Sequence, residues 1–259
     1  MTQITDVSGF MIDLDGTIYK GNDPIEGAKE FIDLLKKKKM PFVFLTNNSS
    51  SSRLYYVSKL NRMGFNIETK NVLTSTVATL RYIQEKYPGK SVYPLGTEQF
   101  ISEVKEVCAI NENDPDIVLL GFDRTITYDR INKAYNHLMN GSIFVATHPD
   151  DLCPTESGYD IDIGPFIRLF ESMTGTKAEV IGKPNPLMIE MAALEMNVSR
   201  KGMIMVGDRL YTDMRMASDS GIRSILVLSG ETGPNGPGIA DVSPTFTVGS
   251  VADIGKMIK

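Results

Sequence analysis

Short apolar runs alternate with amphipathic stretches along almost the whole chain, and this alternation restricts the fold more than any other feature. An apolar run of about four to eight residues predicts a buried strand. The segments with this pattern are residues 7–13, 41–47, 71–75, 91–96, 116–122, 142–148, 179–183, 202–208 and 224–229. Strands separated by helices form parallel sheets covered by helices, because a parallel crossover needs a long connection. The sequence therefore predicts an α/β protein.

The connecting stretches have the period of amphipathic helices. Residues 28–35 place apolar side chains at i, i+3, i+4 and i+7, which is one face of a helix. Residues 187–194 repeat this spacing, and Pro184 and Pro186 just before them favour a helix start. We therefore predict a doubly wound, Rossmann-like parallel sheet covered by helices.

The chain has 259 residues, enough for one large domain or two modest ones. Polar residues of the types that take part in catalysis follow predicted strands near both ends of the chain, whereas the middle stretch carries no comparable cluster. The middle stretch has the size of a domain and predicted strands of its own. We therefore predict a catalytic core made of residues 1–77 and 181–259, with a smaller α/β domain of residues 78–180 inserted into it.

Composition and charge exclude several classes of protein. Hydrophobic residues make up 42% and charged residues 23% of the chain, as in ordinary globular proteins. The net charge is −5 and the lysines are scattered, so no nucleic-acid partner is expected. No apolar stretch reaches membrane-spanning length and no signal peptide is visible, so we expect a cytoplasmic protein without a membrane partner. Cys108 and Cys153 lack metal-type spacing and are predicted to be free thiols.

Acidic residues follow two of the most apolar predicted strands. Asp13 and Asp15 end the first of them. Asp208 ends the strand predicted at 202–208, and Asp213 follows in the next segment. The carboxyl edge of a parallel sheet is where open α/β folds bind ligands. Crowded carboxylates repel one another and a divalent cation would stabilise them, so the pattern predicts a metal-dependent enzyme.

Four motifs occur in order along the chain: DLDGT at 13–17, LTNN at 45–48, GKP at 182–184, and GDRLYTD at 207–213. This order resembles the haloacid dehalogenase superfamily of phosphohydrolases over the whole chain. The large insertion, with LTNNS and GKPNP beside it, resembles the NagD-like and p-nitrophenylphosphatase-like branch, which carries a large α/β (C2-type) cap. The resemblance implies a phosphatase whose inserted cap selects the leaving group.

The chemistry of the first motif fits phosphoryl transfer. The Asp13 carboxylate can attack phosphorus and form an aspartyl phosphate, which divides one hard step into two. Asp15, redirected by a turn at Gly16, can protonate the ester oxygen and later accept a proton from water. The motif alone would favour another interpretation, a capping aspartate in an Asp-Gly turn. The resemblance implies the two catalytic roles.

Three further residues are candidates for binding the phosphate group. Thr46 and Asn47 end a predicted strand, where their side chains and the following backbone N–H groups can form an anion cradle or cap a helix. Lys183 lies between a strand and a helix, where its charge can neutralise both the phosphate and Asp13. Lys183 is therefore a catalytic candidate too, although an ordinary surface lysine is the alternative.

Magnesium is the expected cofactor, because Mg²⁺ prefers few carboxylates completed by water and phosphate oxygens. Asp13 and Asp208 are the predicted side-chain ligands, and the resemblance adds the backbone carbonyl of Asp15. Asp213 is a further candidate, for the metal, for a metal-bound water or for Lys183. An acidic residue in the first turn of a helix is the alternative for Asp213.

The remaining substrate-binding candidates come from two regions. In the fourth motif they are Arg209 and Thr212. The resemblance implies that loops of the cap cover the phosphate site. The candidates there are Asp123, His148 and Asp150, and the segment 156–164 is another cap-loop candidate.

The predicted function is Mg²⁺-dependent hydrolysis of small soluble phosphate esters, such as nucleotides or sugar phosphates, through an aspartyl-phosphate intermediate. One alternative is a receiver-like signalling module that accepts phosphate on Asp13, but such modules are about half as long as this chain. Another alternative is a non-catalytic ligand-sensing protein of the same fold. The resemblance also implies a homodimer that forms through the cap.

Overall fold

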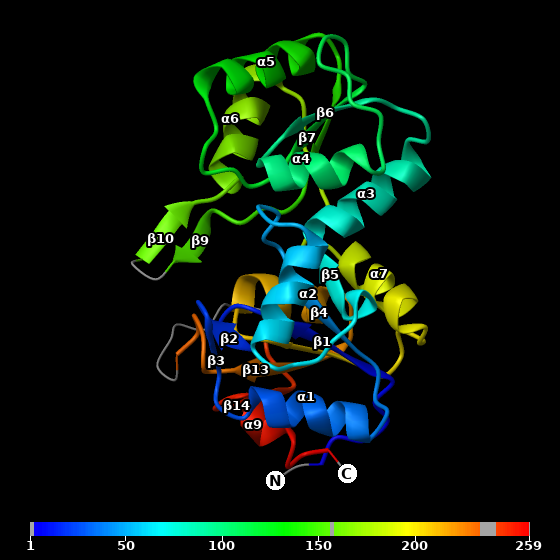
Figure 1. The fold of residues 1–259 in the computed structure, drawn as a ribbon, viewed down its shortest axis with the longest axis vertical. Coiled ribbons are helices and arrows are strands. Elements are labelled where there is room, and N and C mark those ends of the chain that lie inside the picture. The colour runs from blue at the N-terminus through cyan, green and yellow to red at the C-terminus, as the bar shows by residue number, and fades with distance from the viewer. Residues whose placement is uncertain (1–2, 156–157, 234–241, 259) are drawn as a thin grey trace. The chain divides into compact units, whose positions relative to one another are not determined.

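The computed structural model describes residues 3–155, 158–233 and 242–258 (Figure 1). The chain divides into two compact units. Unit 1 consists of Met1–Thr46, Leu54–Leu73 and Lys183–Lys259, and unit 2 consists of Asn47–Arg53 and Thr74–Gly182. The predicted division has its boundaries at 77/78 and 180/181, and it assigns residues 47–53 to the core.

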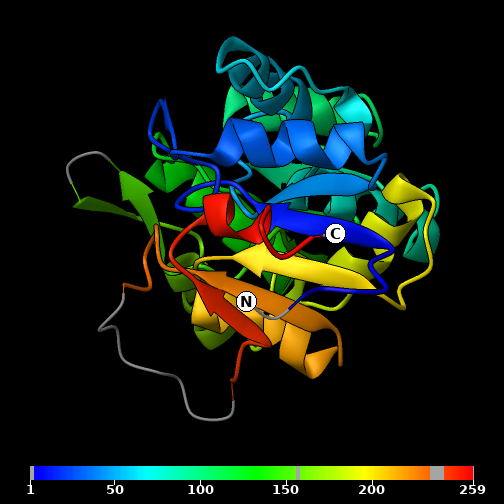
Figure 2. The ribbon, with the colours of Figure 1, turned by 90° about the horizontal axis from the view of Figure 1, so that it is seen from below.

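Unit 1 is built on a six-stranded sheet with the order β14-β13-β12-β1-β4-β5. The strands are β1 (Gly9–Asp13), β4 (Phe42–Thr46), β5 (Val72–Thr74), β12 (Met203–Gly207), β13 (Arg223–Val227) and β14 (Phe246–Val248). The neighbouring pairs from β14 to β4 are parallel. Figure 2 shows β1 in blue, β12 in yellow and β13 in orange side by side. The carboxyl end of β1 is therefore flanked by those of β12 and β4.

Helices cover both faces of this sheet. They are α1 (Ala28–Lys37), α2 (Arg53–Arg62), α7 (Leu187–Met196), α8 (Arg215–Asp219) and α9 (Val251–Ile254). Phe10 and Ile12 of β1 pack in one apolar cluster with α1 and α9, because alternate strand residues share a face. On the other face α7 contacts β1 and β4, and its buried Met188 and Ile189 lie outside that cluster. The predicted α/β class with a doubly wound core is confirmed.

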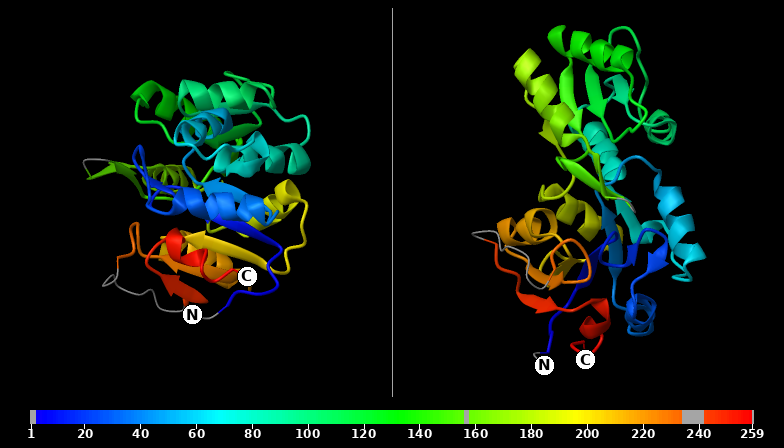
Figure 3. Two further views of the ribbon diagram at one scale, coloured as in Figure 1. Left: turned by 60° about the horizontal axis from the view of Figure 1, so that its bottom comes forward. Right: turned by 90° about the vertical axis from the view of Figure 1, so that its left-hand side faces the viewer.

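Unit 2 contains a four-stranded parallel sheet with the order β11-β8-β7-β6. Its strands are β6 (Val92–Leu95), β7 (Ile117–Leu120), β8 (Ile143–Ala146) and β11 (Glu179–Val180). Its helices are α3 (Ser75–Lys86), α4 (Glu98–Lys105), α5 (Tyr128–Met139) and α6 (Gly164–Thr174). Helices α5 and α6 cover one face of this sheet, where Leu120 and Phe144 pack with Leu138 and Phe170 (Figure 3). The strands β9 (Leu152–Thr155) and β10 (Gly158–Ile161) form a separate antiparallel pair.

Local sequence explains several element ends. In α1, Glu30 lies in the first turn and Lys36 in the last, which suits the helix dipole. Helices α3 and α5 begin after Thr74 and Thr127, whose side chains accept a hydrogen bond from a backbone N–H of the first turn. These caps satisfy backbone donors that the helix itself leaves without partners.

All the strands predicted from apolar runs are present, and the helices predicted at 28–35 and 187–194 are α1 and α7. The prediction lacks β14, the pair β9–β10, and the short pair β2 (Tyr19–Lys20) and β3 (Asp23–Pro24). These strands are short or lie partly in solvent, so no apolar run marks them. Residues 230–237 are rich in Gly and Pro, which predicts a surface loop after a strand, and residues 234–237 of this segment lie outside the described residues.

Two smaller expectations concern the membrane and the cysteines. Across the ranges that the structure describes, no helix has both the length and the apolar character needed to cross a bilayer. Among the described residues neither Cys108 nor Cys153 forms a disulfide, as predicted, and both are partly buried.

Candidate active site

The strand order brings the predicted polar residues to one edge of the sheet in unit 1. Because β1 and β12 are parallel neighbours, Asp13 and Asp208 follow adjacent strands at the same edge. Strand β4 lies on the other side of β1, with Leu45 opposite Asp13. Thr46, the buried last residue of β4, therefore lies at this edge as well.

Three carboxylates form the centre of the site. Asp13, Asp208 and Asp213 each offer one oxygen, and these oxygens lie within 4.8 Å of one another. All three residues are buried, and Asp213 is buried completely. Asp213 reaches this position because a turn of π-helix, Leu210–Met214, follows closely after β12. A donor set made only of oxygens is the kind that Mg²⁺ prefers, so these residues fit the predicted cation.

Lys183 brings a positive charge to these carboxylates. Its ammonium contacts the Asp13 carboxylate and lies 2.7 Å from Oδ1 of Asp213. Burial disfavours the charged ammonium, but the two carboxylates outweigh this effect and raise the pKa of Lys183 above its ordinary value. Lys183 is therefore charged at neutral pH, as its predicted role requires. The peptide bond that links Lys183 to Pro184 is cis.

Two carboxylates of the cluster, those of Asp208 and Asp213, have a raised pKa and are harder to ionise than ordinary aspartates. Burial raises the pKa of Asp208, and repulsion from Asp13 and Asp213 raises it further. Burial also raises the pKa of Asp213, although the nearby Lys183 ammonium opposes this change. When all three aspartates are ionised, they carry three negative charges, and Lys183 neutralises only one of them. A divalent cation beside these oxygens would relieve the repulsion, which is a second indication that the residues fit a metal.

Four neighbours fix the Asp208 carboxylate in place. The Thr17 hydroxyl donates to Oδ1 at 3.3 Å, and the backbone N–H of Glu231 donates to Oδ2 at 2.6 Å. Gly16 and Gly230 also lie against this carboxylate, since a Cβ atom there would lie 2.4 and 1.9 Å from Oδ2. Gly16 has φ +83°, in the left-handed region that favours glycine. A larger residue at either glycine would displace the carboxylate.

Asp15 lies in a different environment from Asp13. The Tyr19 hydroxyl donates to Oδ2 of Asp15 at 3.3 Å, and the Lys59 ammonium lies 3.8 Å from the centre of the Tyr19 ring. Burial, followed by the charge of Asp13, raises the pKa of Asp15 to about 6. A carboxyl group with such a pKa can exchange a proton near neutral pH, which suits a general acid and base.

The other predicted residues of unit 1 belong to the segment that positions Asp213. The backbone N–H of Arg209 donates to Oδ2 of Asp213 at 3.3 Å, and the Arg209 side chain pairs with Glu231 at 3.1 Å. Thr212 lies in the π-helix beside Asp213 and is buried. Contact of Arg209, Thr212 and Thr46 with a substrate stays a prediction.

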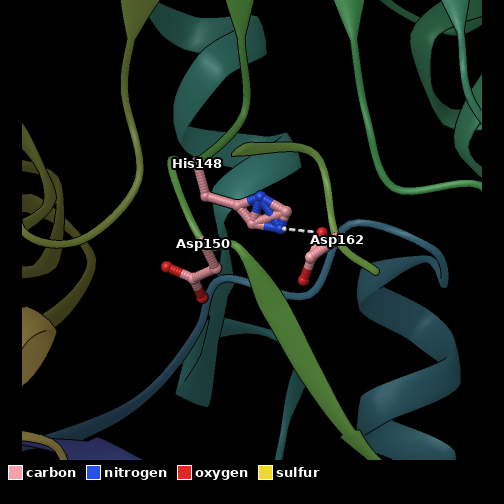
Figure 4. Close-up of side chains that lie close together, drawn as sticks. All are labelled: His148, Asp150 and Asp162. Atoms are coloured by element: carbon pink, nitrogen blue, oxygen red, sulfur yellow. Dashed lines mark ion pairs between the residues drawn. The ribbon is translucent and has the colours of Figure 1, made fainter. Parts of the chain in front are cut away.

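The remaining substrate-binding candidates, Asn47, Asp123, His148 and Asp150, all belong to unit 2. The buried Asp123 carboxylate pairs with Nη1 of Arg130 at 2.6 Å. The Asn47 side-chain amide donates to Oδ1 of Asp150 at 3.1 Å. His148 lies in a buried group with Asp150 (Figure 4). Contact of these four residues with a substrate also stays a prediction.

The motifs do not reveal three contacts that the structure shows, those of Tyr19, Glu231 and Arg130. Tyr19 follows the first motif, but its apolar surroundings indicate a core residue. Only its hydroxyl group contacts Asp15. Glu231 acts on Asp208 through its backbone N–H, which any residue except proline could supply. Arg130 lies on α5, a helix whose sequence suggests exposure to solvent. The acidic residue Asp123 is therefore the only feature of the sequence that points to the ion pair between the two residues.

Two family models match this chain in separate stretches. The model described as haloacid dehalogenase-like hydrolase matches residues 10–108, and the model described as HAD-hydrolase-like matches residues 180–254. The acid sugar phosphatase of Staphylococcus aureus (strain MRSA252) is 34% identical over 240 residues, which are 92% of this chain and 93% of the relative. The chain belongs to the haloacid dehalogenase-like hydrolases.

Solved structures extend the similarity of this haloacid dehalogenase-like hydrolase to its whole length. The 4-nitrophenylphosphatase of Thermotoga maritima superposes with a TM-score of 0.93 at 39% identity, and 97% of each chain is covered. NagD from E. coli K-12 has a TM-score of 0.88 at 29% identity, with 98% and 99% covered. The resemblance read from the motifs is confirmed, and this hydrolase is a phosphatase. These relatives favour a phosphatase over the receiver-like module.

Proposed function

We propose that this phosphatase hydrolyses small phosphate monoesters with Mg²⁺ and through a phosphorylated Asp13. The observation that carries the proposal is the contact of Lys183 with Asp13, in the cluster with Asp208 and Asp213. A nucleophilic carboxylate, a charged lysine and an oxygen-rich cation site thus share one edge of the sheet. This combination supports phosphoryl transfer, in which positioning and charge neutralisation supply most of the catalysis.

The first half-reaction transfers the phosphoryl group to the protein. The Asp13 carboxylate attacks phosphorus, so a bond from phosphorus to an Asp13 oxygen forms and the ester bond to the leaving oxygen breaks. Asp15 donates its proton to that leaving oxygen, and the alcohol departs neutral. The pKa of about 6 supports this role, because part of the Asp15 population is protonated near neutral pH.

The second half-reaction regenerates the carboxylate. Asp15, now ionised, accepts a proton from a water molecule whose oxygen attacks phosphorus. The bond between phosphorus and Asp13 breaks, and inorganic phosphate leaves. Asp15 ends protonated and Asp13 ends ionised, so the protein returns to its starting state.

The remaining residues hold charge in place during both steps. Lys183 positions Asp13 and can neutralise phosphate oxygens, and Thr46 is a candidate donor to the same oxygens. We propose that Asp13, Asp208 and the Asp15 carbonyl hold Mg²⁺, with Asp213 holding Lys183 and a metal-bound water. When bound, Mg²⁺ would neutralise charge on the transferring phosphoryl group.

Sugar phosphates are the substrate class that we propose. The support comes from the acid sugar phosphatase of Staphylococcus aureus, which is 34% identical to this chain over 240 residues, or 92% of this chain. Nucleotides use the same chemistry at phosphorus, so a comparison of the two classes tests the proposal.

The test measures phosphate release from a panel of sugar phosphates, nucleoside monophosphates and 4-nitrophenyl phosphate, with Mg²⁺ and with excess EDTA. We expect kcat/KM for the best sugar phosphate to exceed that for the best nucleotide by about tenfold or more. EDTA should abolish hydrolysis and added Mg²⁺ should restore it. Undiminished rates in excess chelator would contradict the metal, and a nucleotide preference would contradict the substrate class.

A further inference from the structure

A second group of potential metal ligands lies within unit 2. His148 follows β8, Asp150 precedes β9 and Asp162 follows β10, so three separate points of the chain meet here (Figure 4). One nitrogen of His148 and one oxygen of each aspartate lie within 4.8 Å of one another. The three residues are 0%, 6% and 3% exposed. We refer to them as the His148 cluster.

We propose that the His148 cluster binds a divalent transition metal of the zinc type. Nε2 of His148 lies 3.3 Å from Oδ1 of Asp162. Two ligands of one tetrahedral zinc ion, each about 2.0–2.2 Å from the metal, are separated by roughly 3.3 Å. His148 and Asp162 therefore already have the separation of two zinc ligands. One oxygen of Asp150 lies within 4.8 Å of both ligand atoms, which makes Asp150 the candidate for the third ligand.

The backbone around the cluster fixes its loops in position. The N–H of Asp162 donates to the Asp151 carbonyl at 2.9 Å, and the N–H of Gly164 donates to the Asp150 carbonyl at 2.8 Å. A Cβ atom on Gly164 would lie 2.9 Å from that Asp150 carbonyl oxygen, so glycine permits this close approach. The Asn47 amide donates to Oδ1 of Asp150 at 3.1 Å, in the manner of an outer-shell partner that orients a ligand.

Charge and donor type favour a zinc-type metal at this position. In this cluster a metal ligand must be a neutral imidazole or an ionised carboxylate, so in the metal-binding form the two carboxylates bring two negative charges, and buried charge is costly unless it is compensated. A divalent cation would neutralise both. An imidazole nitrogen suits zinc and similar transition metals, whereas Mg²⁺ prefers oxygen ligands only. The His148 cluster therefore differs in preference from the all-oxygen cluster of Asp13, Asp208 and Asp213.

The histidine content makes a direct test possible, because the chain has only 2 histidines, His137 and His148. His137 lies on α5, where its ring centre is 5.0 Å from that of Tyr93, and it serves as an internal control. The experiment records the ring ¹⁵N resonances of histidine-labelled full-length protein during a Zn²⁺ titration. The protein titrated is the Asp13→Asn, Asp208→Asn double variant, which lacks two carboxylates of the unit 1 cluster. We expect one equivalent of Zn²⁺ to shift the His148 resonances and to leave those of His137 unchanged.

Two single variants in the same background separate binding from general charge. Asp162→Asn keeps the shape of the side chain and is expected to weaken Zn²⁺ binding about 10- to 100-fold. Asp151→Asn is the matched control, because the Asp151 carboxylate pairs with Arg168 at 2.6 Å outside the cluster. It should bind Zn²⁺ as tightly as its parent. Metal-free His137 resonances that match the parent establish that unit 2 of each variant is folded, because His137 lies beside Tyr93 outside the cluster.

Three results would overturn the proposal. The first is no shift of the His148 resonances on adding Zn²⁺. The second is an equal shift of both histidines, which indicates general association of the metal with the protein. The third is equal Zn²⁺ affinity in the Asp162→Asn variant and its parent.

Discussion

At the scale of single residues, the two aspartates of the first motif have different surroundings, which support the different roles that we propose for them. Asp13 contacts the Lys183 ammonium, whereas Asp15 accepts a hydrogen bond from the Tyr19 hydroxyl. Burial raises the pKa of Asp15 to about 6. Departure of an alcohol needs the protonated form, which is lost as the pH rises through this pKa. We therefore expect kcat/KM for a sugar phosphate to fall above about pH 6, and a pH–rate profile measures this directly.

The Tyr19 hydroxyl adjusts this pH dependence. Its hydrogen bond stabilises the ionised carboxylate and so lowers the pKa of Asp15. In Tyr19→Phe we expect the alkaline limb of the kcat/KM profile to move to higher pH, with a loss of about 1 kcal/mol in the free energy of unfolding. Tyr87→Phe, which removes a hydroxyl bonded to Glu179 in unit 2, should leave the profile unchanged. A limb that stays in place or moves to lower pH in Tyr19→Phe would contradict the role of Tyr19.

Glycines close to Asp208 provide a second prediction at this scale. A Cβ atom on Gly230 would lie 1.9 Å from Oδ2 of Asp208, whereas a Cβ atom on Gly233 meets nothing within 4 Å. Gly230→Ala should therefore displace the carboxylate, cost about 1–3 kcal/mol in stability and raise the Mg²⁺ concentration needed for half-maximal activity. Gly233→Ala is the matched control from the same loop. Equal Mg²⁺ requirements in the two variants would contradict the proposed role of Asp208.

At the scale of elements, β1 carries Asp13, the proposed nucleophile, and also contributes to the core of unit 1. Ile12 precedes Asp13 directly and is fully buried in the apolar cluster of unit 1. Ile12→Ala leaves a cavity there and should lower the free energy of unfolding by about 2–5 kcal/mol. Leu194→Ala changes a residue of α7 that is 69% exposed, so it should alter stability by only about 0.5 kcal/mol. Urea unfolding measures both, and similar losses in the two variants would contradict this description of the core.

The elements that could be predicted are those with a strong apolar pattern. Strand β12 is buried at every position, so an apolar run identifies it and places Asp208 at its end. Strands β9 and β10 have exposed residues such as Leu152 and Ile161, and nothing in their sequence separates them from a loop. Residues 47–53 form a short polar segment, and only its contacts in three dimensions assign it to unit 2.

The site could be predicted as far as motif spacing and strand order determine it. The sequence places Asp13, Asp208 and Lys183 at strand ends, and the sheet order brings them together. The contacts of Tyr19 and Glu231 depend on turn geometry and a backbone N–H, so no residue pattern indicates them. Pairing of two chains through the cap and a cytoplasmic location stay predictions.

At the scale of the whole molecule, the acidic cluster links stability to pH and to metal. Burial raises the pKa of Asp208 and Asp213 above their unfolded values, so the folded state binds protons more tightly. The metal-free protein should therefore be most stable below the unfolded-state pKa values of these two aspartates. Its free energy of unfolding should fall as the pH rises through their folded-state pKa values. Differential scanning calorimetry across a pH series measures this, and a rise in stability over the same range would contradict it.

Mg²⁺ should restore the stability that the metal-free protein loses. A ligand that binds only the folded state at 100 times its dissociation constant adds about 2.7 kcal/mol. We expect a gain of this order at neutral pH, shown by a higher Tm, and no gain in Asp208→Asn. An equal rise in Tm in Asp208→Asn would contradict the assignment of this residue to the metal.

The central claim is that Asp13 forms a covalent bond to phosphorus, and trapping that species tests it most directly. Asp15→Asn removes the base that activates water, so the intermediate should accumulate. Radiolabelled 4-nitrophenyl phosphate suits this variant, because its leaving group departs without protonation. After an acid quench, we expect label on the peptide that contains Asp13, released by hydroxylamine and absent from the Asp13→Asn, Asp15→Asn double variant. Label on another residue, or equal label in the double variant, would contradict a covalent bond between Asp13 and phosphorus.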